Sequence, residues 1–134
     1  MTRVAILDDY QNTALGSADW RSLLGFEIKT FNQHLGHDEV QIAAILSDFD
    51  VIVCMRERTP FPKSLLDQLP NLKYLITTGM RNLSIDMDAA KVNGVVISGT
   101  QMLGYPAYEH AWALILAITK KIPHEDQVMK SGGW

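Results

Sequence analysis

The stretch LKYLITTGMRN, residues 72–82, decides how the chain folds. Its apolar first half stops at two threonines and Gly79, which is typical of a buried strand that ends in a tight turn. Such a turn presents backbone N–H groups at the carboxyl edge of a sheet, where the ligands of open α/β sheets bind. Arg81 follows directly, and its planar guanidinium suits a carboxylate or a phosphate. An ordinary strand-to-helix turn with a solvated arginine is the alternative interpretation.

Strand and helix patterns alternate on both sides of this stretch. Short apolar runs predict strands at residues 3–7, 50–55, 73–77 and 95–98, and alternating apolar and polar residues predict a strand at the edge of the sheet over residues 26–31. Capping residues and apolar faces predict helices over residues 17–24, 38–47, 63–69 and 86–93. Five βα units of this length predict an α/β fold, a flavodoxin-like parallel five-stranded sheet with helices on both faces.

A long helix is predicted to follow the last strand. Pro106 opens it, and the pattern continues to about residue 122. Its segment Ala111–Ile118 is apolar all round, so it has to be covered on every side. The sheet can cover only one side, so we expect a second domain or a partner chain against the rest. A bare apolar patch of this kind also predicts self-association, as a homodimer, through this segment.

We therefore divide the chain into a domain over residues 1–104 and a second part over residues 105–134. The second part is read as a crossover helix and the start of a domain that is missing. The closing SGGW, residues 131–134, predicts a truncated chain or the ordered part of a longer polypeptide.

Composition limits the classes of function. A net charge of −3 argues against non-specific binding to nucleic acids and to membrane surfaces. Cys54 is the single cysteine, so no internal disulfide can form and a cytoplasmic location is expected. Cys54 lies in an apolar run, where a buried, inert thiol is expected. No signal peptide is visible, and no apolar run is long enough to span a bilayer.

One constellation to consider is that of a phospho-receiver domain. Asp8 and Asp9 follow the first predicted strand, and Thr77 ends the fourth. Receiver chemistry also needs a carboxylate at the exit of the third strand to accept phosphate and help hold Mg²⁺. Met55 and Arg56 stand there instead, which disfavours a receiver. The four histidines lack metal-ligand spacing, so no metal site is predicted.

A second constellation suits an anionic ligand. Arg56 and Arg58 leave the third predicted strand, and the amides of residues 79–81 leave the fourth. Both loops emerge at the same edge of a parallel sheet, so cations and N–H donors converge there. The alternative is a pair of solvated loop arginines, one of them paired with Glu57.

Several segments in this order resemble the front part of the D-isomer-specific 2-hydroxyacid dehydrogenases. The segments are VIVCMRERT at 51–59, LITTGMRNLSIDMDAA at 75–90, YEHAWALILA at 108–117 and GGW at 132–134. This resemblance implies two flavodoxin-like lobes, one for the substrate and a Rossmann lobe for NAD or NADP. The long helix would be the crossover between them, and the cofactor would be bound mainly by the missing lobe.

The resemblance also implies an activity for the full-length parent. Such a parent would be an NAD(P)-dependent oxidoreductase that transfers hydride between nicotinamide and a D-2-hydroxy acid or 2-keto acid. The family's catalytic Arg, Glu and His would lie beyond Trp134, so no catalytic residue is assigned in this chain. The fragment alone would be inactive and would bind no nicotinamide tightly. A stand-alone flavodoxin-like or receiver-type ligand-binding domain without enzymatic activity is the alternative.

Substrate-binding residues are implied in the same way. The backbone amides of Met80 and Arg81, in the turn begun by Gly79, would hold the substrate carboxylate. Arg56 matches a substrate-contacting arginine of some members, and Thr59 would lie near the cofactor. The chain departs from the family in carrying Arg81 where glycine is usual, which adds charge to the pocket or restricts the size of the substrate.

Overall fold

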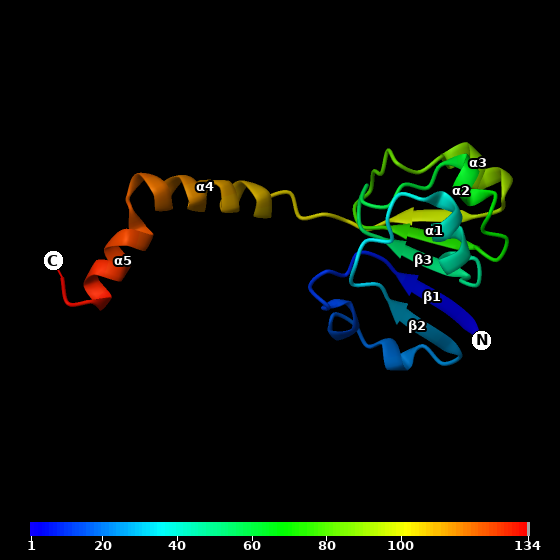
Figure 1. Ribbon diagram of the computed structural model, residues 1–134, viewed down its shortest axis with the longest axis horizontal. Coiled ribbons are helices and arrows are strands. Elements are labelled where there is room, and N and C mark those ends of the chain that lie inside the picture. Colours follow the sequence, from blue (N-terminus) through cyan, green and yellow to red (C-terminus); the bar gives the residue numbers. More distant parts are fainter. Residues whose placement is uncertain (134) are drawn as a thin grey trace. The chain divides into compact units, whose positions relative to one another are not determined.

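The structure, a computed structural model, describes residues 1–133 and consists of two compact units. The first unit covers residues 1–101 and the second begins at residue 102. The strands of the first unit are β1 (Thr2–Ile6), β2 (Phe26–Thr30), β3 (Val51–Cys54), β4 (Tyr74–Thr77) and β5 (Val96–Gly99). They form one parallel sheet in the order β2-β1-β3-β4-β5, as Figure 1 shows. The predicted five-stranded parallel sheet is confirmed, and each strand end lies within one residue of its prediction.

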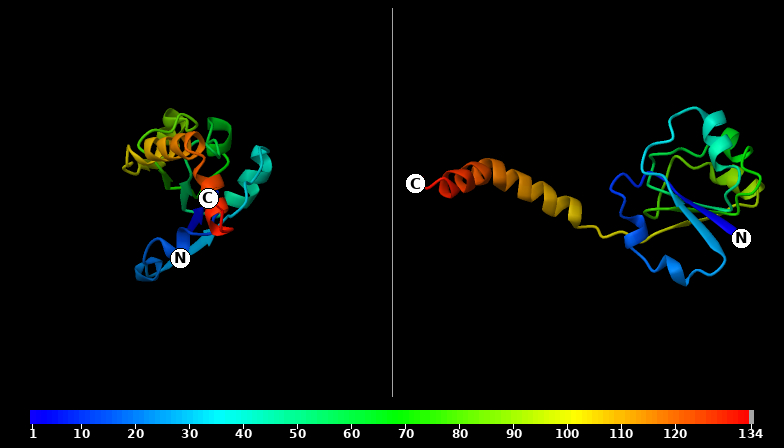
Figure 2. Two further views of the ribbon diagram at one scale, coloured as in Figure 1. Left: turned by 90° about the vertical axis from the view of Figure 1, so that its left-hand side faces the viewer. Right: turned by 60° about the horizontal axis from the view of Figure 1, so that its bottom comes forward.

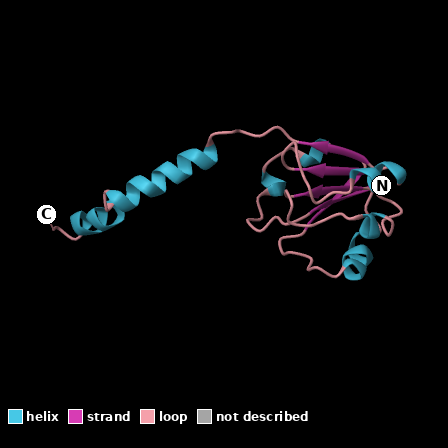
Figure 3. Ribbon diagram, turned by 90° about the horizontal axis from the view of Figure 1, so that it is seen from above, coloured by secondary structure: helices cyan, strands magenta, loops and turns pink. Residues whose placement is uncertain are grey.

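All five strands point to the same edge of the sheet (Figures 1 and 3), and the N-terminus lies at the opposite edge (Figure 2). The helices between the later strands are α1 (Glu39–Leu46), α2 (Lys63–Leu66) and α3 (Met87–Val92). They lie side by side over one face of the sheet. The β1–β2 connection runs in the opposite direction along the sheet, so right-handed crossover places it on the other face.

Two predicted helix starts are explained by their caps. Asp38 Oδ1 accepts hydrogen bonds from the N–H groups of Val40 and Gln41 at 3.0 and 3.4 Å. Asp86 Oδ1 accepts one from Ala89 N at 2.9 Å. Each carboxylate satisfies N–H groups that have no partner inside the helix, which sets where α1 and α3 begin.

The helix predicted over residues 17–24 is wrong. The β1–β2 connection instead contains two short 3₁₀ helices, Ala14–Gly16 and Trp20–Ser22, and neither has a buried residue. The Trp20 indole Nε1 donates to the carbonyl of Ala14 at 2.8 Å, and this bond holds the chain in tight turns. Without a buried apolar face, so short a segment gains too little from packing to form an α-helix.

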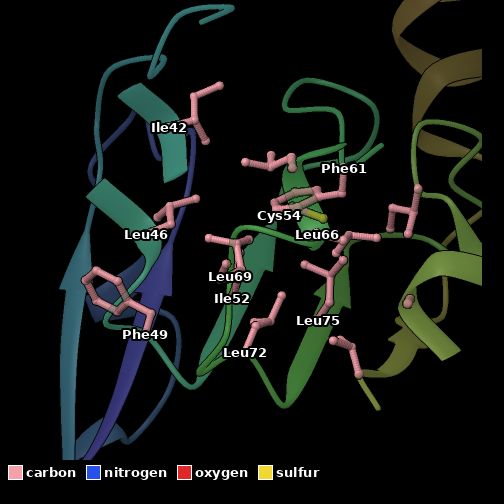
Figure 4. Close-up of a cluster of buried hydrophobic side chains, with 14 of the residues drawn as sticks. Ile42, Leu46, Phe49, Ile52, Cys54, Phe61, Leu66, Leu69, Leu72 and Leu75 are labelled. Atoms are coloured by element: carbon pink, nitrogen blue, oxygen red, sulfur yellow. The ribbon is translucent and has the colours of Figure 1, made fainter. Parts of the chain in front are cut away.

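The core lies between the sheet and helices α1 to α3. Ala5, Ile52 and Leu75 are neighbours in the strand register and are fully buried. Figure 4 shows Leu46 of α1 and Leu66 of α2 over this face. Because successive side chains of a strand alternate between faces, this face is built from every second strand residue.

The second unit contains α4 (Pro106–Thr119) and α5 (Ile122–Lys130). The predicted long helix is confirmed, although it ends at Thr119 rather than near residue 122. Pro123 accounts for the earlier end, because a proline ring clashes with the carbonyl four residues before it. Within the described part of the unit, neither helix has a buried residue, and Trp112 is 64% exposed. Among residues 1–133, no helix has the length and apolar character needed to cross a membrane.

Candidate functional site

The turn after β4 presents two backbone donors at the carboxyl edge of the sheet. Gly79 has a φ of 96°, a left-handed conformation that favours glycine. The N–H of Thr78 donates to the carbonyl of Cys54 at 3.1 Å, and that of Gly79 donates to Thr100 Oγ1 at 2.9 Å. The next two N–H groups, of Met80 and Arg81, have no hydrogen-bond partner among the residues that the structure describes. This pair of adjacent donors, which we call the amide cradle, can donate hydrogen bonds to an anionic oxygen.

Asn82 fixes the cradle to the preceding loop. Its side-chain Nδ2 donates to the carbonyl of Arg56 at 2.6 Å and to Thr77 Oγ1 at 3.0 Å. Its Oδ1 accepts from the N–H of Ser84 at 2.9 Å. One amide side chain therefore joins the loop after β3, the end of β4 and the loop after β4.

Gly99, at the end of β5, supports the cradle from the other side. A Cβ atom built on Gly99 would lie 2.4 Å from the Gly79 carbonyl oxygen and 2.8 Å from Met80 Cα. Both contacts are shorter than van der Waals packing allows, so only glycine fits beneath this turn. The roles of Gly99 and Asn82 were not predicted from the sequence, because a glycine after a strand and a loop asparagine are each common.

The structure places the two arginines of the β3 exit differently. Arg56 adopts a left-handed φ of 54°, and its N–H donates to Thr78 Oγ1 at 3.1 Å, beside the cradle. Its half-exposed side chain has Nε 3.9 Å from a Glu57 oxygen. The Arg58 guanidinium lies instead over the Tyr10 ring, 4.6 Å from its centroid, at the exit of β1. The backbone of Arg56 therefore lies beside the cradle, whereas the Arg58 side chain lies at the exit of β1, and the convergence of cations with the N–H donors stays a prediction.

Thr59, the residue expected near the cofactor, is fully buried. Its hydroxyl donates to Asp8 Oδ2 at 2.9 Å. The hydroxyl thus already has a partner inside this unit. A contact between Thr59 and a cofactor stays a prediction.

Asp8 is the buried centre of a polar cluster, whereas its position after the first strand had pointed only to a receiver domain. Its side chain is 1% exposed, and its carboxylate receives hydrogen bonds from Tyr10 Oη at 3.0 Å and Thr59 Oγ1. His34 Nδ1 lies 3.1 Å from the same carboxylate. Burial and the bond to Asp8 raise the pKa of Tyr10, so its phenol is a donor at neutral pH. Both oxygens of the Asp8 carboxylate thus already have hydrogen-bond partners inside this unit.

The other ionisable group in the neighbourhood is the Cys54 thiol. It is fully buried beneath the cradle, and burial raises the pKa of Cys54 to about 11. A thiol with such a pKa is protonated at neutral pH and is a poor nucleophile. Within residues 1–133, no three His, Cys, Asp or Glu side chains are grouped so that they could hold a metal ion.

Comparison with known proteins gives a family context for this geometry. Residues 4–109 match the model of the D-isomer specific 2-hydroxyacid dehydrogenase catalytic domain. A hydroxypyruvate reductase of Blautia hydrogenotrophica is 24% identical over 98% of this chain and 41% of its own length. A D-3-phosphoglycerate dehydrogenase of Archaeoglobus fulgidus is 30% identical over 83% of this chain and 20% of its own length.

Two solved structures of such enzymes are also similar to the chain. The phosphoglycerate oxidoreductase of Vibrio cholerae O395 matches with a TM-score of 0.81 and 34% identity, over the whole of this chain and 42% of its own length. The NAD-dependent formate dehydrogenase of Staphylococcus aureus shares the fold, with a TM-score of 0.64 and 20% identity. The chain spans less than half the length of each of these four proteins.

Proposed function

The chain belongs to the D-isomer-specific 2-hydroxyacid dehydrogenase family, and we propose that it is the substrate-binding part of an NAD(P)-dependent oxidoreductase. The full-length parent would interconvert a small D-2-hydroxy acid and its 2-keto acid. In the oxidation, hydride leaves C2 for the nicotinamide while the hydroxyl proton goes to a base. Within this chain we assign binding and orientation of the acid, and we assign no catalytic residue.

The observation that carries this proposal is the amide cradle. The N–H groups of Met80 and Arg81 are adjacent and lack partners within residues 1–133. A substrate carboxylate accepts hydrogen bonds from such a pair, and a charged acceptor makes them stronger than neutral ones. Arg56, whose backbone is joined to Thr78 beside the cradle, adds a cation for the same anion. An acid whose carboxylate is held here would have its C2 atom next to the carboxyl edge of the sheet.

The nicotinamide cofactor is proposed to bind mainly outside this chain. The sequence has no Gly-x-Gly-x-x-Gly motif, the loop that places a pyrophosphate on a helix N-terminus. Thr59, the residue expected near the cofactor, has its hydroxyl bound to Asp8. We therefore propose that Thr59 lies near NAD or NADP but does not make the main contacts with it.

Two measurements test the proposal. In the first, the full-length parent is mixed with NADH or NADPH and glyoxylate, pyruvate or hydroxypyruvate, and the loss of absorbance at 340 nm is followed. In the second, the ¹⁵N-labelled chain is titrated with pyruvate, and the amide signals of residues 80 and 81 should move most. Residue 16, in the β1–β2 connection, serves as the internal control. If no keto acid is reduced and no amide moves, the chain is a ligand-binding domain of another kind.

We also propose that the parent forms a homodimer through the segment Ala111–Ile118 of α4 and resides in the cytoplasm. Trp112 and Ile118 are 64% and 76% exposed, and such large apolar side chains favour association when they gather. Sedimentation of the parent should show a dimer that Trp112→Glu weakens. Val92→Glu is the matched control, since Val92 is 82% exposed on α3. A parent that sediments as a monomer would contradict the proposal.

A further inference from the structure

A hollow lies at the point where the direction of the sheet connections changes. β1 and β3 are neighbours, but the chain leaves β1 toward β2 and leaves β3 toward β4, on opposite sides. Open α/β sheets bind ligands in the crevice at such a switch point. The hollow measures about 270 Å³ and is lined by Asp8, Asp9, Tyr10, Gln11, Thr13, Met55 and Arg58. We call it the switch-point hollow.

The hollow contains a guanidinium that the fold holds in place. Arg58 lies over the Tyr10 ring at 4.6 Å and donates through Nη1 to the backbone carbonyl of Asp8 at 3.2 Å. Tyr10 in turn is held by its hydrogen bond to the buried Asp8 carboxylate. A guanidinium has five N–H donors in a fixed plane, so one bond to Asp8 leaves others for a ligand. A preorganised donor binds with little loss of side-chain entropy.

The charges around the hollow disfavour an anionic group there, in addition to the carboxylate at the amide cradle. Asp8 and Asp9 are 2% and 8% exposed and together outweigh the single positive charge of Arg58. Asp9 Oδ1 and Oδ2 accept from the N–H groups of Thr13 and Ala14 at 2.9 and 3.1 Å, so both carboxylates are fixed there. An anionic group would meet two buried negative charges, while an alkyl group would displace water from the Arg58 guanidinium without replacing its hydrogen bonds. A hydroxyl group, which is neutral and accepts from Arg58, meets neither cost.

The hollow lies within reach of a molecule bound at the amide cradle. Thr78, which precedes the cradle, donates through Oγ1 to the Met55 sulfur at 3.1 Å, and Met55 lines the hollow. Adjacent strands lie about 4.8 Å apart, so the exits of β3 and β1 are roughly 5 and 10 Å from that of β4. An acid of about five carbons whose carboxylate sits on the cradle extends past the exit of β3, and a hydrogen bond of about 2.9 Å at its far end adds to this reach toward Arg58.

We propose that the switch-point hollow binds the tail of the substrate, and that this tail is neutral and hydroxylated. Arg58 is then the specificity-determining residue, because it donates to the tail hydroxyls. The inference rests on the proposed function and deepens it: the substrate is a 2-keto or 2-hydroxy acid with hydroxyls on the carbons beyond C3. Acids of equal length with an alkyl or an anionic tail fit the hollow less well.

The test uses the full-length parent with NADH or NADPH and three five-carbon 2-keto acids. These are 4,5-dihydroxy-2-oxopentanoate, 2-oxopentanoate and 2-oxoglutarate, with glyoxylate as a short reference. For the natural protein, kcat/KM for the dihydroxy acid should exceed that for each of the others by about tenfold or more. Arg58→Gln should lower the ratio of kcat/KM for the dihydroxy acid to kcat/KM for 2-oxopentanoate to about two. Arg21→Gln, a change of an exposed arginine in the β1–β2 connection, should leave that preference unchanged.

The outcomes separate the two proposals. A preference for 2-oxoglutarate would show an anion-binding hollow and overturn the inference, as would equal values for the three acids when glyoxylate is reduced. Failure to reduce any of the four would overturn the proposed function and the inference with it. The comparison of substrates on the natural protein needs no variant, so it decides the matter even if Arg58→Gln does not fold.

Discussion

Replacement of Gly99 by alanine is the sharpest test of how the cradle is supported. The added Cβ would lie 2.4 Å from the Gly79 oxygen and 2.8 Å from Met80 Cα, where packed heavy atoms normally lie about 3.5–4.0 Å apart. The Gly79 turn would have to move by about 1 Å, since both contacts are with backbone rather than with a flexible side chain. The hydrogen bonds of Thr78 to Cys54 and of Gly79 to Thr100 oppose that movement.

We expect Gly99→Ala to destabilise the first unit by about 1–3 kcal/mol, the usual cost of overpacking. For a unit of this size, that is a fall in Tm of about 4–24 °C. Thermal unfolding followed by circular dichroism measures it. Gly16→Ala is the matched control, because nothing lies within 4 Å of the Cβ position at Gly16. In the parent, Gly99→Ala should also raise KM for the keto acid. Equal Tm values for the two variants would refute the close approach of β5 to the cradle.

Three further predictions concern single residues of the first unit. Asn82→Ala should cost about 1–3 kcal/mol in urea unfolding, because it removes the bonds of this side chain to the hydroxyl of buried Thr77 and to the Ser84 N–H. A loss smaller than about 0.5 kcal/mol, the scatter of surface changes, would contradict this. Hydrogen bonds from Lys73 and from the Arg3 N–H lower the pKa of Asp50, so Asp50→Asn should lower Tm at pH 7. The difference in Tm between the variant and the natural chain should disappear as the pH falls from about 4 through the folded-state pKa of Asp50. A difference that persists at pH 2 would count against the ion pair. The raised pKa of Cys54, about 11, predicts that Ellman's reagent reacts at pH 8 only once urea unfolds the unit, and rapid labelling of the native chain would disprove its burial.

The strands were predictable because their signal is local. Four strands are short apolar runs, and β2 shows the alternation of an edge strand. Asp38 and Asp86 mark helix starts through contacts two or three residues away. The helix predicted over residues 17–24 failed because the Trp20 indole binds a carbonyl six residues earlier, which no helical periodicity reveals. Local patterns were therefore enough to predict the strands of the sheet but not the conformation of the β1–β2 connection.

The site was predictable only in part, for the same reason. The turn after β4 is recognisable from Gly79 and its neighbours, so the cradle could be expected from the sequence. The Asp8 cluster could not, because Thr59 and His34 reach Asp8 from 51 and 26 residues away along the chain. Only the pairing of β1 with β3 brings these residues together. The distinction between Arg56 and Arg58, two residues apart, likewise depends on the loop conformation.

The cradle uses main-chain rather than side-chain donors, and this has a consequence for how the protein can be changed. Every non-proline residue supplies the same N–H group, so substitution at position 80 or 81 need not remove the anchor for the acid. Met80 is 72% exposed, which leaves room for other side chains there. Libraries for directed evolution can therefore diversify positions 80 and 81 to alter the surroundings of the substrate. Gly79 and Gly99 should be kept, because the shape of the turn is encoded in them.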